Sequence, residues 1–214
     1  MSSALPRIYV LAGVNGAGKS SIAGAAFREH GGDYYNPDEA ARRLMNANPA
    51  LSQPEANSRA WHTGRALLEK AIARRLDFAF ETTLGASTIP RLLAQAAKDG
   101  IEVRIWYAGL ASAALHISRV RSRVARGGHN IPEAVIRRRF EHSRLNLIQL
   151  MPSLTALRVY DNSAPADPAA GKAPAPALVL HMERGKIMNP QDLAHAPNWA
   201  KPIVAAAMKL GLKR

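Results

Sequence analysis

Residues 13–20 read GVNGAGKS, and this segment narrows the choice of fold more than any other part of the chain. It fits the pattern G-x-x-x-x-G-K-S of a phosphate-binding P-loop. The apolar, β-prone stretch 8–12 precedes it, and the helix-compatible stretch 21–27 follows it. A strand, a glycine turn and a helix start direct successive backbone N–H groups at one point, where a polyphosphate binds. The flanks therefore favour a nucleotide-phosphate site over a chance glycine-rich turn.

The members of this motif have distinct expected tasks. Lys19 is expected to reach the β- and γ-phosphates, and the Ser20 hydroxyl to hold Mg²⁺. Gly16 and Gly18 let the backbone wrap closely around the phosphates. The residues of this segment that are predicted to bind the nucleoside triphosphate are Gly13, Asn15, Gly16, Ala17, Gly18, Lys19, Ser20 and Ser21.

Length and composition predict one α/β domain over residues 1–214. A chain of 214 residues, 47% of them hydrophobic, can bury about 70% of its unfolded surface in one core. The absence of cysteine excludes disulfides and thiolate metal sites, and it fits a cytoplasmic location. The N-terminal residues lead directly into the P-loop strand, so we expect no signal peptide there. No apolar stretch is long enough to span a membrane.

The net charge of +13 has two interpretations. One is nucleic-acid binding. The other is a phosphate-rich ligand combined with a solvated basic surface. Arginines cluster between Arg119 and Arg144, where few aromatic residues are present to stack on bases. We therefore favour a small anionic substrate and keep nucleic acid as the second interpretation.

Strands alternate with helices along the chain, which predicts a mostly parallel sheet flanked by helices, with ligands at the carboxyl ends of the strands. Predicted strands cover residues 7–12, 33–36, 77–81, 101–107, 157–160 and 178–182. Predicted helices cover 19–29, a segment from 37 onward, 52–75, 87–98, 112–126, 132–151 and the tail from 190 onward. The Ala- and Pro-rich residues 164–177 are predicted to form an exposed, mobile loop.

The segment Asn36-Pro37-Asp38 directly follows a predicted strand. A carboxylate at the mouth of the sheet can take the proton from an attacking hydroxyl group. However, Asn36 as N-cap, Pro37 at the first helical position and Asp38 in the first turn also make a good helix start. The residues alone leave both roles of Asp38 open.

The segment Glu81-Thr82-Thr83 ends another predicted strand. Its carboxylate and hydroxyl groups could bind Mg²⁺ through water or form hydrogen bonds with an acceptor. Alternatively, the threonines serve local backbone bonds in a turn. The buried character of residues 78–80 favours the functional interpretation, because such a strand ends beside the P-loop.

Arginines lie on both sides of the break at Gly127-Gly128. Before it, Arg119, Arg123 and Arg126 share one helix face, whereas Arg121 points elsewhere. After it come residues 137–139, all arginine, of which at most two can face one site. Two arginine-bearing helices around a glycine turn predict a closing lid over residues 119–144, which would neutralise charge during phosphoryl transfer. Arginines that do not enter the site would belong to a solvated basic surface.

No strand of four apolar residues ending in Asp follows the P-loop. The nearest candidate is LRVYD at residues 157–161, and Arg158 interrupts its apolar pattern. This argues against motor and transporter ATPases and favours a small kinase in which Ser20 and water hold the metal. The sequence also contains no His/Asp cluster at metal-binding spacing and no Ser-His-Asp order typical of hydrolases.

Four segments in order, GVNGAGKS, NPD, FAFETTL and RVRSRVARGGHNIPEAVIRRRF, resemble the zeta-toxin family of kinases over residues 8–150. The resemblance implies a P-loop kinase fold that phosphorylates a sugar hydroxyl of UDP-N-acetylglucosamine or a similar UDP-sugar, using ATP and Mg²⁺. It also implies a toxin held inactive by a small antitoxin protein, although we expect no antitoxin sequence fused before the first strand.

The resemblance also implies roles for individual residues. Lys19 and Ser20 match the P-loop pair, and Asp38 matches the carboxylate that acts as base. Glu81 and Thr83 match strand-end residues near the metal and the acceptor, so Glu81 joins Ser20 as a candidate metal ligand. The remaining candidates are phosphate contacts from Arg123 and from Arg138 or Arg139, and nucleotide contacts from Arg119 and from Asn162, the latter to the base.

The acceptor pocket departs from the family pattern. The large acceptor-binding additions of longer toxins are absent, and Arg65 or Glu69 could stand in for an acceptor-binding group without aligning cleanly. A kinase of another small metabolite or nucleotide is therefore an alternative. A nucleic-acid-binding NTPase or polynucleotide kinase is a further alternative, supported by the positive charge.

Overall fold

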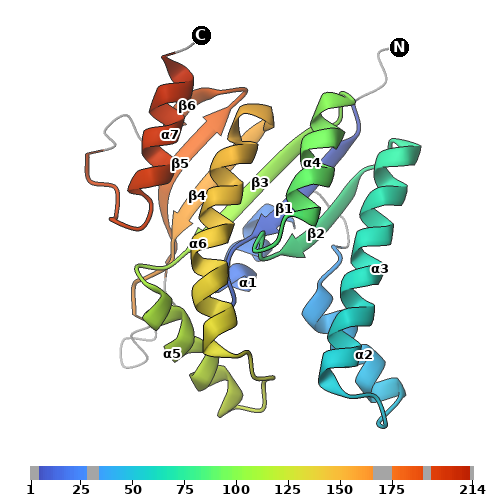
Figure 1. Ribbon diagram of the computed structural model, residues 1–214. Coiled ribbons are helices and arrows are strands. Elements are labelled where there is room, and N and C mark those ends of the chain that lie inside the picture. The colour runs from blue at the N-terminus through green and yellow to red at the C-terminus, as the bar shows by residue number, and fades with distance from the viewer. Residues whose placement is uncertain (1–4, 28–33, 166–174, 190–193, 213–214) are drawn as a thin grey trace.

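A six-stranded sheet in the order β2-β1-β3-β4-β5-β6 forms the centre of the computed structural model, which describes residues 5–27, 34–165, 175–189 and 194–212 (Figure 1). The first four strands along the chain run parallel, and the last two are antiparallel. The strands are β1 (Arg7–Ala12), β2 (Phe78–Thr82), β3 (Glu102–Gly109), β4 (Ala156–Asp161), β5 (Ala177–Glu183) and β6 (Lys186–Asn189). The predicted, mostly parallel sheet is confirmed.

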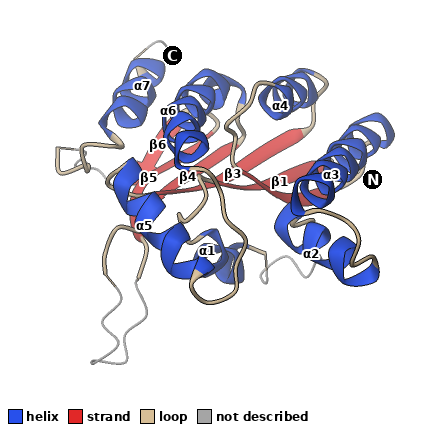
Figure 2. Ribbon diagram, turned by 60° about the horizontal axis from the view of Figure 1, so that its bottom comes forward, coloured by secondary structure: helices blue, strands red, loops and turns tan. Residues whose placement is uncertain are grey.

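Helices cover both faces of this sheet (Figure 2). They are α1 (Lys19–Ala26), α2 (Pro37–Ala47), α3 (Gln53–Arg74), α4 (Thr88–Lys98), α5 (Ala113–Val124), α6 (Glu133–Leu150) and α7 (Lys201–Gly211). The main core lies between the sheet and α3, α4, α6 and α7, whereas α1 packs on the opposite face. β1 supplies both cores because successive side chains alternate: Ile8 and Val10 face the first, Tyr9 and Leu11 the second.

Local sequence signals explain most element boundaries. At the start of α3, Ser52 and Glu55 form the predicted capping box, in which the Glu55 carboxylate accepts the Ser52 N–H at 3.1 Å. α2 begins at Pro37 behind Asn36, whose side chain accepts the N–H groups of Asp38 and Glu39. Both helix starts thus lie where the sequence predicts them.

Several sequence predictions need correction or fall outside the described residues. The predicted strand 33–36 is only a single bridge between Tyr35 and Phe80, because the chain turns into α2 immediately afterwards. β6 was not predicted, since its four residues are largely exposed and carry no strong strand pattern. Most of the predicted loop 164–177 and the end of the predicted helix 19–29 lie outside the described residues. In the tail, the helix begins at Lys201.

The topology gathers the candidate residues at one edge of the sheet. β1, β2, β3 and β4 are parallel, so their carboxyl ends point the same way and place the segments after Ala12, Thr82 and Asp161 together. Within the described residues, no helix is long and apolar enough to cross a membrane.

Candidate active site

The P-loop connects β1 to the N-terminus of α1, as its sequence predicts. Gly18 has a φ of +75°, and a Cβ atom there would lie 2.3 Å from Nδ2 of Asn162, so the turn requires glycine. Lys19 is buried, and its Nζ donates to the carbonyl of Gly13 at 2.8 Å. A glycine turn, a helix N-terminus and a buried lysine are the groups that bind a polyphosphate, so the residues present fit ATP.

Oxygen donors for Mg²⁺ come from α1 and β2. Ser20 is exposed in the first turn of α1. Glu81 lies at the end of β2, where its Oε1 is 3.3 Å from Nζ of Lys19. Among the described residues there is no group of three or more His, Asp or Glu side chains that could hold a metal. Because Mg²⁺ usually keeps water and substrate phosphates as ligands, Ser20 and Glu81 suit a metal bound mainly through a nucleotide.

A cavity of about 500 Å³ opens beside the P-loop. Helices α2 and α3 form one side, and the α5–α6 connection with the start of α6 forms the other. Tyr35, Trp61 and Phe80 contribute an aromatic wall. The predicted site residues that line this cavity are Asn15, Lys19, Asp38, Glu81, Thr83, Arg138 and Arg139. The structure therefore brings together seven residues that the sequence spreads over 125 positions.

Asp38 lies at the rim of this cavity in the first turn of α2. Its Oδ2 is 3.9 Å from Nη1 of Arg123, and its Oδ1 is 3.9 Å from Nε2 of His129. Burial lowers the pKa of His129, and the charge of Asp38 opposes this shift. Asn36 caps the helix with its oxygen and donates from Nδ2 to Oε2 of Glu81 at 3.3 Å. Asp38 is thus both a helix-start residue and a cavity residue, and its role as base stays a prediction.

Two of the three consecutive arginines reach the cavity. Nη1 of Arg139 donates to Oδ1 of Asn15 at 2.7 Å, which places its guanidinium on the P-loop. Burial lowers the pKa of Arg139, with Asp38 acting in the opposite direction, and a guanidinium stays charged at neutral pH. Arg138 also lines the cavity, whereas Arg137 is not among its lining residues. The structure thus places Arg138 and Arg139, but not Arg137, at the cavity, and a phosphate contact from either stays a prediction.

The arginines of α5 make different contacts. Arg123 approaches Asp38 and donates from Nη2 to the carbonyl of His129 at 3.4 Å. Arg119 donates to the carbonyl of Ala164 at 3.2 Å. Arg121 pairs with Glu133 at the start of α6, consistent with its predicted different direction. Of these three arginines, only Arg123 approaches a residue of the cavity.

Asn162 lies beneath the P-loop. The residue is 1% exposed, and its Nδ2 donates to the carbonyl of Ala17 at 2.9 Å. The observed contact supports the loop that would bind the phosphates, and a contact with the nucleotide base stays a prediction. The neighbouring Asp161 accepts hydrogen bonds from the Ser163 side chain and from Nε1 of Trp199, the latter at 3.1 Å.

The two threonines after Glu81 are engaged in the turn that follows β2. Oγ1 of Thr82 accepts the N–H of Leu84 at 3.2 Å, and Oγ1 of Thr83 accepts the N–H of Gly85 at 3.3 Å. The local-turn interpretation of both hydroxyl groups is therefore realised. Because Thr83 also lines the cavity, its contact with an acceptor stays a prediction.

The predicted lid over residues 119–144 has a fixed base. In α6, Ser143 is buried and donates to the carbonyl of Thr83 at 2.6 Å, while Asn146 donates to that of Leu84 at the same distance. Arg144 stacks over the Phe140 ring and donates to the carbonyl of Trp199 at 3.2 Å, outside the cavity. Any closure would therefore involve residues before Ser143, and closure itself stays a prediction.

Sequence reasoning missed His116 of α5. His116 is 1% exposed, and its Nδ1 lies 2.9 Å from the carbonyl oxygen of Asn15, so Nδ1 carries the proton and donates. Burial lowers the pKa of His116 to about 4, with smaller contributions from the positive charges of Lys19 and Arg119. Among the described residues, Nε2 has no hydrogen-bond partner. A single histidine on an arginine-rich helix gives no sequence signal for this contact.

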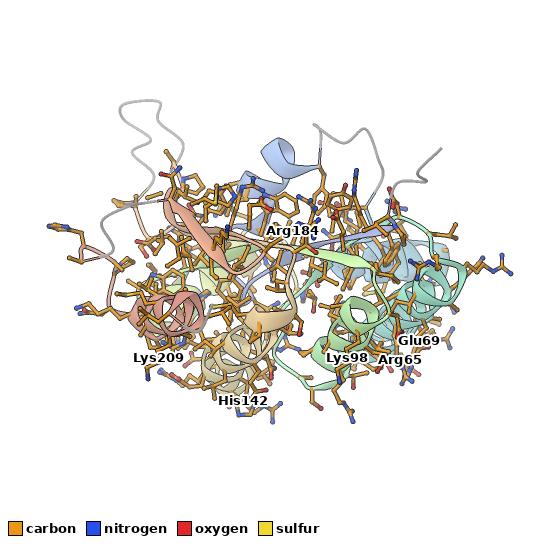
Figure 3. The ribbon with its side chains drawn as sticks, turned by 90° about the horizontal axis from the view of Figure 1, so that it is seen from above. Arg65, Glu69, Lys98, His142, Arg184 and Lys209 are labelled. Carbon is orange, nitrogen blue, oxygen red and sulfur yellow. The ribbon has the colours of Figure 1, made fainter. Side chains whose placement is uncertain are left out.

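Arg65, in the middle of α3, is one of several residues of this helix that line the cavity. It pairs with Glu69 through Nε and Oε1 at 2.8 Å, and Figure 3 shows the two side chains next to each other. Glu69 itself does not line the cavity, so Arg65 is the better candidate for acceptor binding. Lys98, His142 and Lys209 are exposed and lie on the outer helices in the same view. The positive charges of Lys98 and Lys209 therefore belong to a solvated surface.

Several known proteins are similar to this chain in sequence or in structure. A protein of uncharacterized function from Haemophilus influenzae (strain ATCC 51907 / DSM 11121 / KW20 / Rd) is 28% identical over 129 residues, covering 60% of this chain and 88% of that protein. A chain of the AvrRxo1-ORF1:AvrRxo1-ORF2 complex, which has also been solved with ATP, has a TM-score of 0.68 at 16% identity. That match covers 96% of this chain but only 64% of the other.

A second structural match is a chain from the PezAT chromosomal toxin–antitoxin system of Streptococcus pneumoniae. It has a TM-score of 0.54 at 17% identity and covers 82% of this chain and 76% of that one. At these identities the structural matches establish the fold, a P-loop kinase-like α/β architecture. Residues 8–144 match the AAA_33 family model, described as an AAA domain. Because this match spans well over half of the sequence, the chain belongs to the AAA_33 family of P-loop, kinase-like domains.

Proposed function

We propose that this protein is an ATP-dependent kinase that phosphorylates a hydroxyl group of a small anionic acceptor. The observation that carries the proposal is the shared cavity: the P-loop lysine, a carboxylate and two arginines all line it. Lys19 binds the phosphate end of the nucleotide, Asp38 offers a base, and Arg138 and Arg139 supply positive charge. Phosphoryl transfer depends mainly on positioning and charge neutralisation, which this set of residues provides.

In the proposed reaction, the acceptor hydroxyl lies between Asp38 and the γ-phosphate. The Asp38 carboxylate takes the hydroxyl proton as the hydroxyl oxygen forms a bond to the γ-phosphorus, and the bond to the β-phosphate oxygen breaks to release ADP. Lys19 and Arg139 neutralise charge on the transferred group. Mg²⁺, held by Ser20 and Glu81 with water and phosphate oxygens, would screen the same charge.

We propose a UDP-sugar, in the first place UDP-N-acetylglucosamine, as the acceptor. The ordered motifs that resemble the zeta-toxin kinases support this choice, as does the fold shared with a chain of the PezAT system. The lining chemistry agrees, because Trp61 and Tyr35 suit a planar ring and Arg65 and Arg138 suit phosphate groups. The same resemblance supports a role as a cytoplasmic toxin with an antitoxin protein as partner.

The test mixes the protein with Mg-ATP and UDP-N-acetylglucosamine and measures a singly phosphorylated sugar nucleotide by mass spectrometry. We expect the product with the wild type, its loss in Lys19→Ala, and its retention in Arg121→Ala, which removes an arginine paired with Glu133 outside the cavity. ADP release without this product would reject the UDP-sugar as the acceptor, while the proposal of a kinase would stand. The same assay would then be applied to a metabolite extract and to oligonucleotides, which tests the polynucleotide-kinase alternative.

The toxin role has a separate test. Expression of the wild type is expected to inhibit growth, and Lys19→Ala is expected to abolish this inhibition because the variant cannot bind the phosphates productively. Growth inhibition that persists in Lys19→Ala would disprove the kinase account of toxicity without affecting the biochemical assay.

A further inference from the structure

We propose that Asn15, the third residue of the P-loop motif, is a positioning residue that holds Arg139 in place for the γ-phosphate before the nucleotide binds. The proposal rests on phosphoryl transfer at the P-loop, but not on the identity of the acceptor. It assigns a task to the Asn15 side chain that differs from the backbone contacts by which a P-loop binds phosphate.

The side chains of Asn15 and Arg139 are in direct contact. Oδ1 of Asn15 accepts a hydrogen bond from Nη1 of Arg139 at 2.7 Å, between residues 124 positions apart. Asn15 is 6% exposed, and Arg139 is partly buried. A hydrogen bond between a charged donor and a buried acceptor is among the stronger ones in a protein, so it fixes the end of an otherwise flexible side chain.

The second observation is the space made for the arginine stem. A Cβ atom on Gly85, in the turn after β2, would lie 2.6 Å from Cγ and 3.2 Å from Cβ of Arg139. The absence of a side chain at Gly85 therefore lets Arg139 pass close to this turn. Gly85 beside the stem and Asn15 at the guanidinium hold Arg139 along its length.

The third observation is that Asn15 is itself fixed. Its carbonyl oxygen accepts the hydrogen bond from Nδ1 of buried His116 at 2.9 Å. Asn15 is thus held by α5 through its backbone and bonded to α6 through its side chain. Because Asn15 is fixed by both hydrogen bonds, the guanidinium of Arg139 is held in a set position relative to the P-loop.

The hydrogen bond between Asn15 and Arg139 lies where the γ-phosphate is expected to bind. Asn15 and Lys19 line the same cavity, and a P-loop lysine reaches the β- and γ-phosphates. A guanidinium bonded to Asn15 therefore lies at the γ-phosphate end of the site, towards Asp38. Positive charge that is already in place needs no reorganisation when negative charge develops there. ADP lacks the γ-phosphate, so the link should favour binding of the triphosphate.

The test is a double-mutant cycle on nucleotide affinity. Asn15→Ala keeps the backbone carbonyl that His116 binds, and Arg139→Met keeps an unbranched stem beside Gly85 while removing the charge. Isothermal titration in the presence of Mg²⁺ would measure ADP and a non-hydrolysable ATP analogue with the wild type, both single variants and the double variant. The triphosphate-to-diphosphate affinity ratio is the readout, because a purely structural role would weaken both nucleotides equally.

We expect Asn15→Ala to lower this ratio by about 10-fold, the loss typical of one hydrogen bond to a charged group. ADP affinity should change by less than about 2-fold, because the ADP phosphates contact the loop backbone rather than this side chain. The double variant should match Arg139→Met alone. An unchanged ratio in Asn15→Ala, or losses that multiply in the double variant, would overturn the proposal.

The same titrations separate this proposal from the proposed function. If the wild type binds neither nucleotide, kinase chemistry at the P-loop is refuted, and the role of Asn15 with it. If nucleotides bind with the expected ratios but UDP-N-acetylglucosamine is not phosphorylated, only the acceptor is rejected and the Asn15 proposal stands.

Discussion

His116 should make the stability of this protein fall steeply in mildly acidic solution. Its ring is buried and neutral, and burial lowers its pKa in the folded state to about 4. In the unfolded chain the pKa of a histidine is about 6.5. Between these values the unfolded chain binds a proton that the folded protein excludes. The stabilisation is therefore complete above about pH 6.5 and is lost as the pH falls towards 4.

The size of the effect follows from the two pKa values. Between pH 7.5 and pH 5.0, proton binding by the unfolded chain lowers the free energy of unfolding by about 2 kcal/mol. The free energy of unfolding of typical domains is about 5–15 kcal/mol, so this loss is a substantial part of the total. It should therefore be visible as a clear shift of the unfolding midpoint.

Urea unfolding of the wild type and of His116→Asn at both pH values would measure it. The amide of His116→Asn can still donate to the carbonyl of Asn15, but it does not titrate. Comparing the two proteins cancels the contributions of other groups, including His129, whose pKa burial also lowers. We expect the wild type to lose about 2 kcal/mol more than the variant. Equal losses in the two proteins would show that His116 is not held neutral in a buried site.

Three further substitutions, one of them with a matched control, test the site. Asp38→Ala should lower the turnover number by roughly 10²–10⁴-fold while ATP affinity is retained, because the base acts on the acceptor; near-normal turnover would leave Asp38 as a helix-start residue only. Asn36→Asp keeps the cap of α2 but places a second carboxylate beside Glu81, so we expect a midpoint of urea unfolding near that of the wild type and weaker binding of the ATP analogue. Gly18→Ala and Gly100→Ala both replace a glycine of φ near +75°, but only Gly18 lacks space for a Cβ atom; Gly18→Ala alone should abolish nucleotide binding in a titration, and equal effects would contradict the steric argument.

The sequence predicts the parts of this structure whose signals are local. The P-loop pattern, the capping box at Ser52 and the Asn36-Pro37 helix start each depend on residues a few positions apart, and each appears where it was predicted. The apolar, β-prone character of short stretches identified the parallel strands. It could not identify β6, whose residues are mostly exposed and pair only at the edge of the sheet.

The contacts around the P-loop could not be predicted because they join distant elements. The bond from His116 to Asn15 spans 101 positions, and that from Asn162 to Ala17 spans 145. The choice among the three arginines is different, since a sequence signal for it exists. Arg139 lies four residues before Ser143 and eight before Leu147, so helical spacing places it on the buried stripe of α6.

That continuous stripe on α6 has a consequence for heat inactivation. One helix carries Arg139 at the cavity and, two to three turns further on, Leu147 and Leu150 in the main core. Regions that unfold locally are those with few buried apolar contacts. The end of α6 that carries Leu147 and Leu150 is not such a region, because both residues are buried in the main core. The backbone amides of residues 147–150 should exchange with solvent deuterium only when the whole domain opens. Activity and tertiary structure should then disappear at the same temperature, without an earlier step in which the arginine is released.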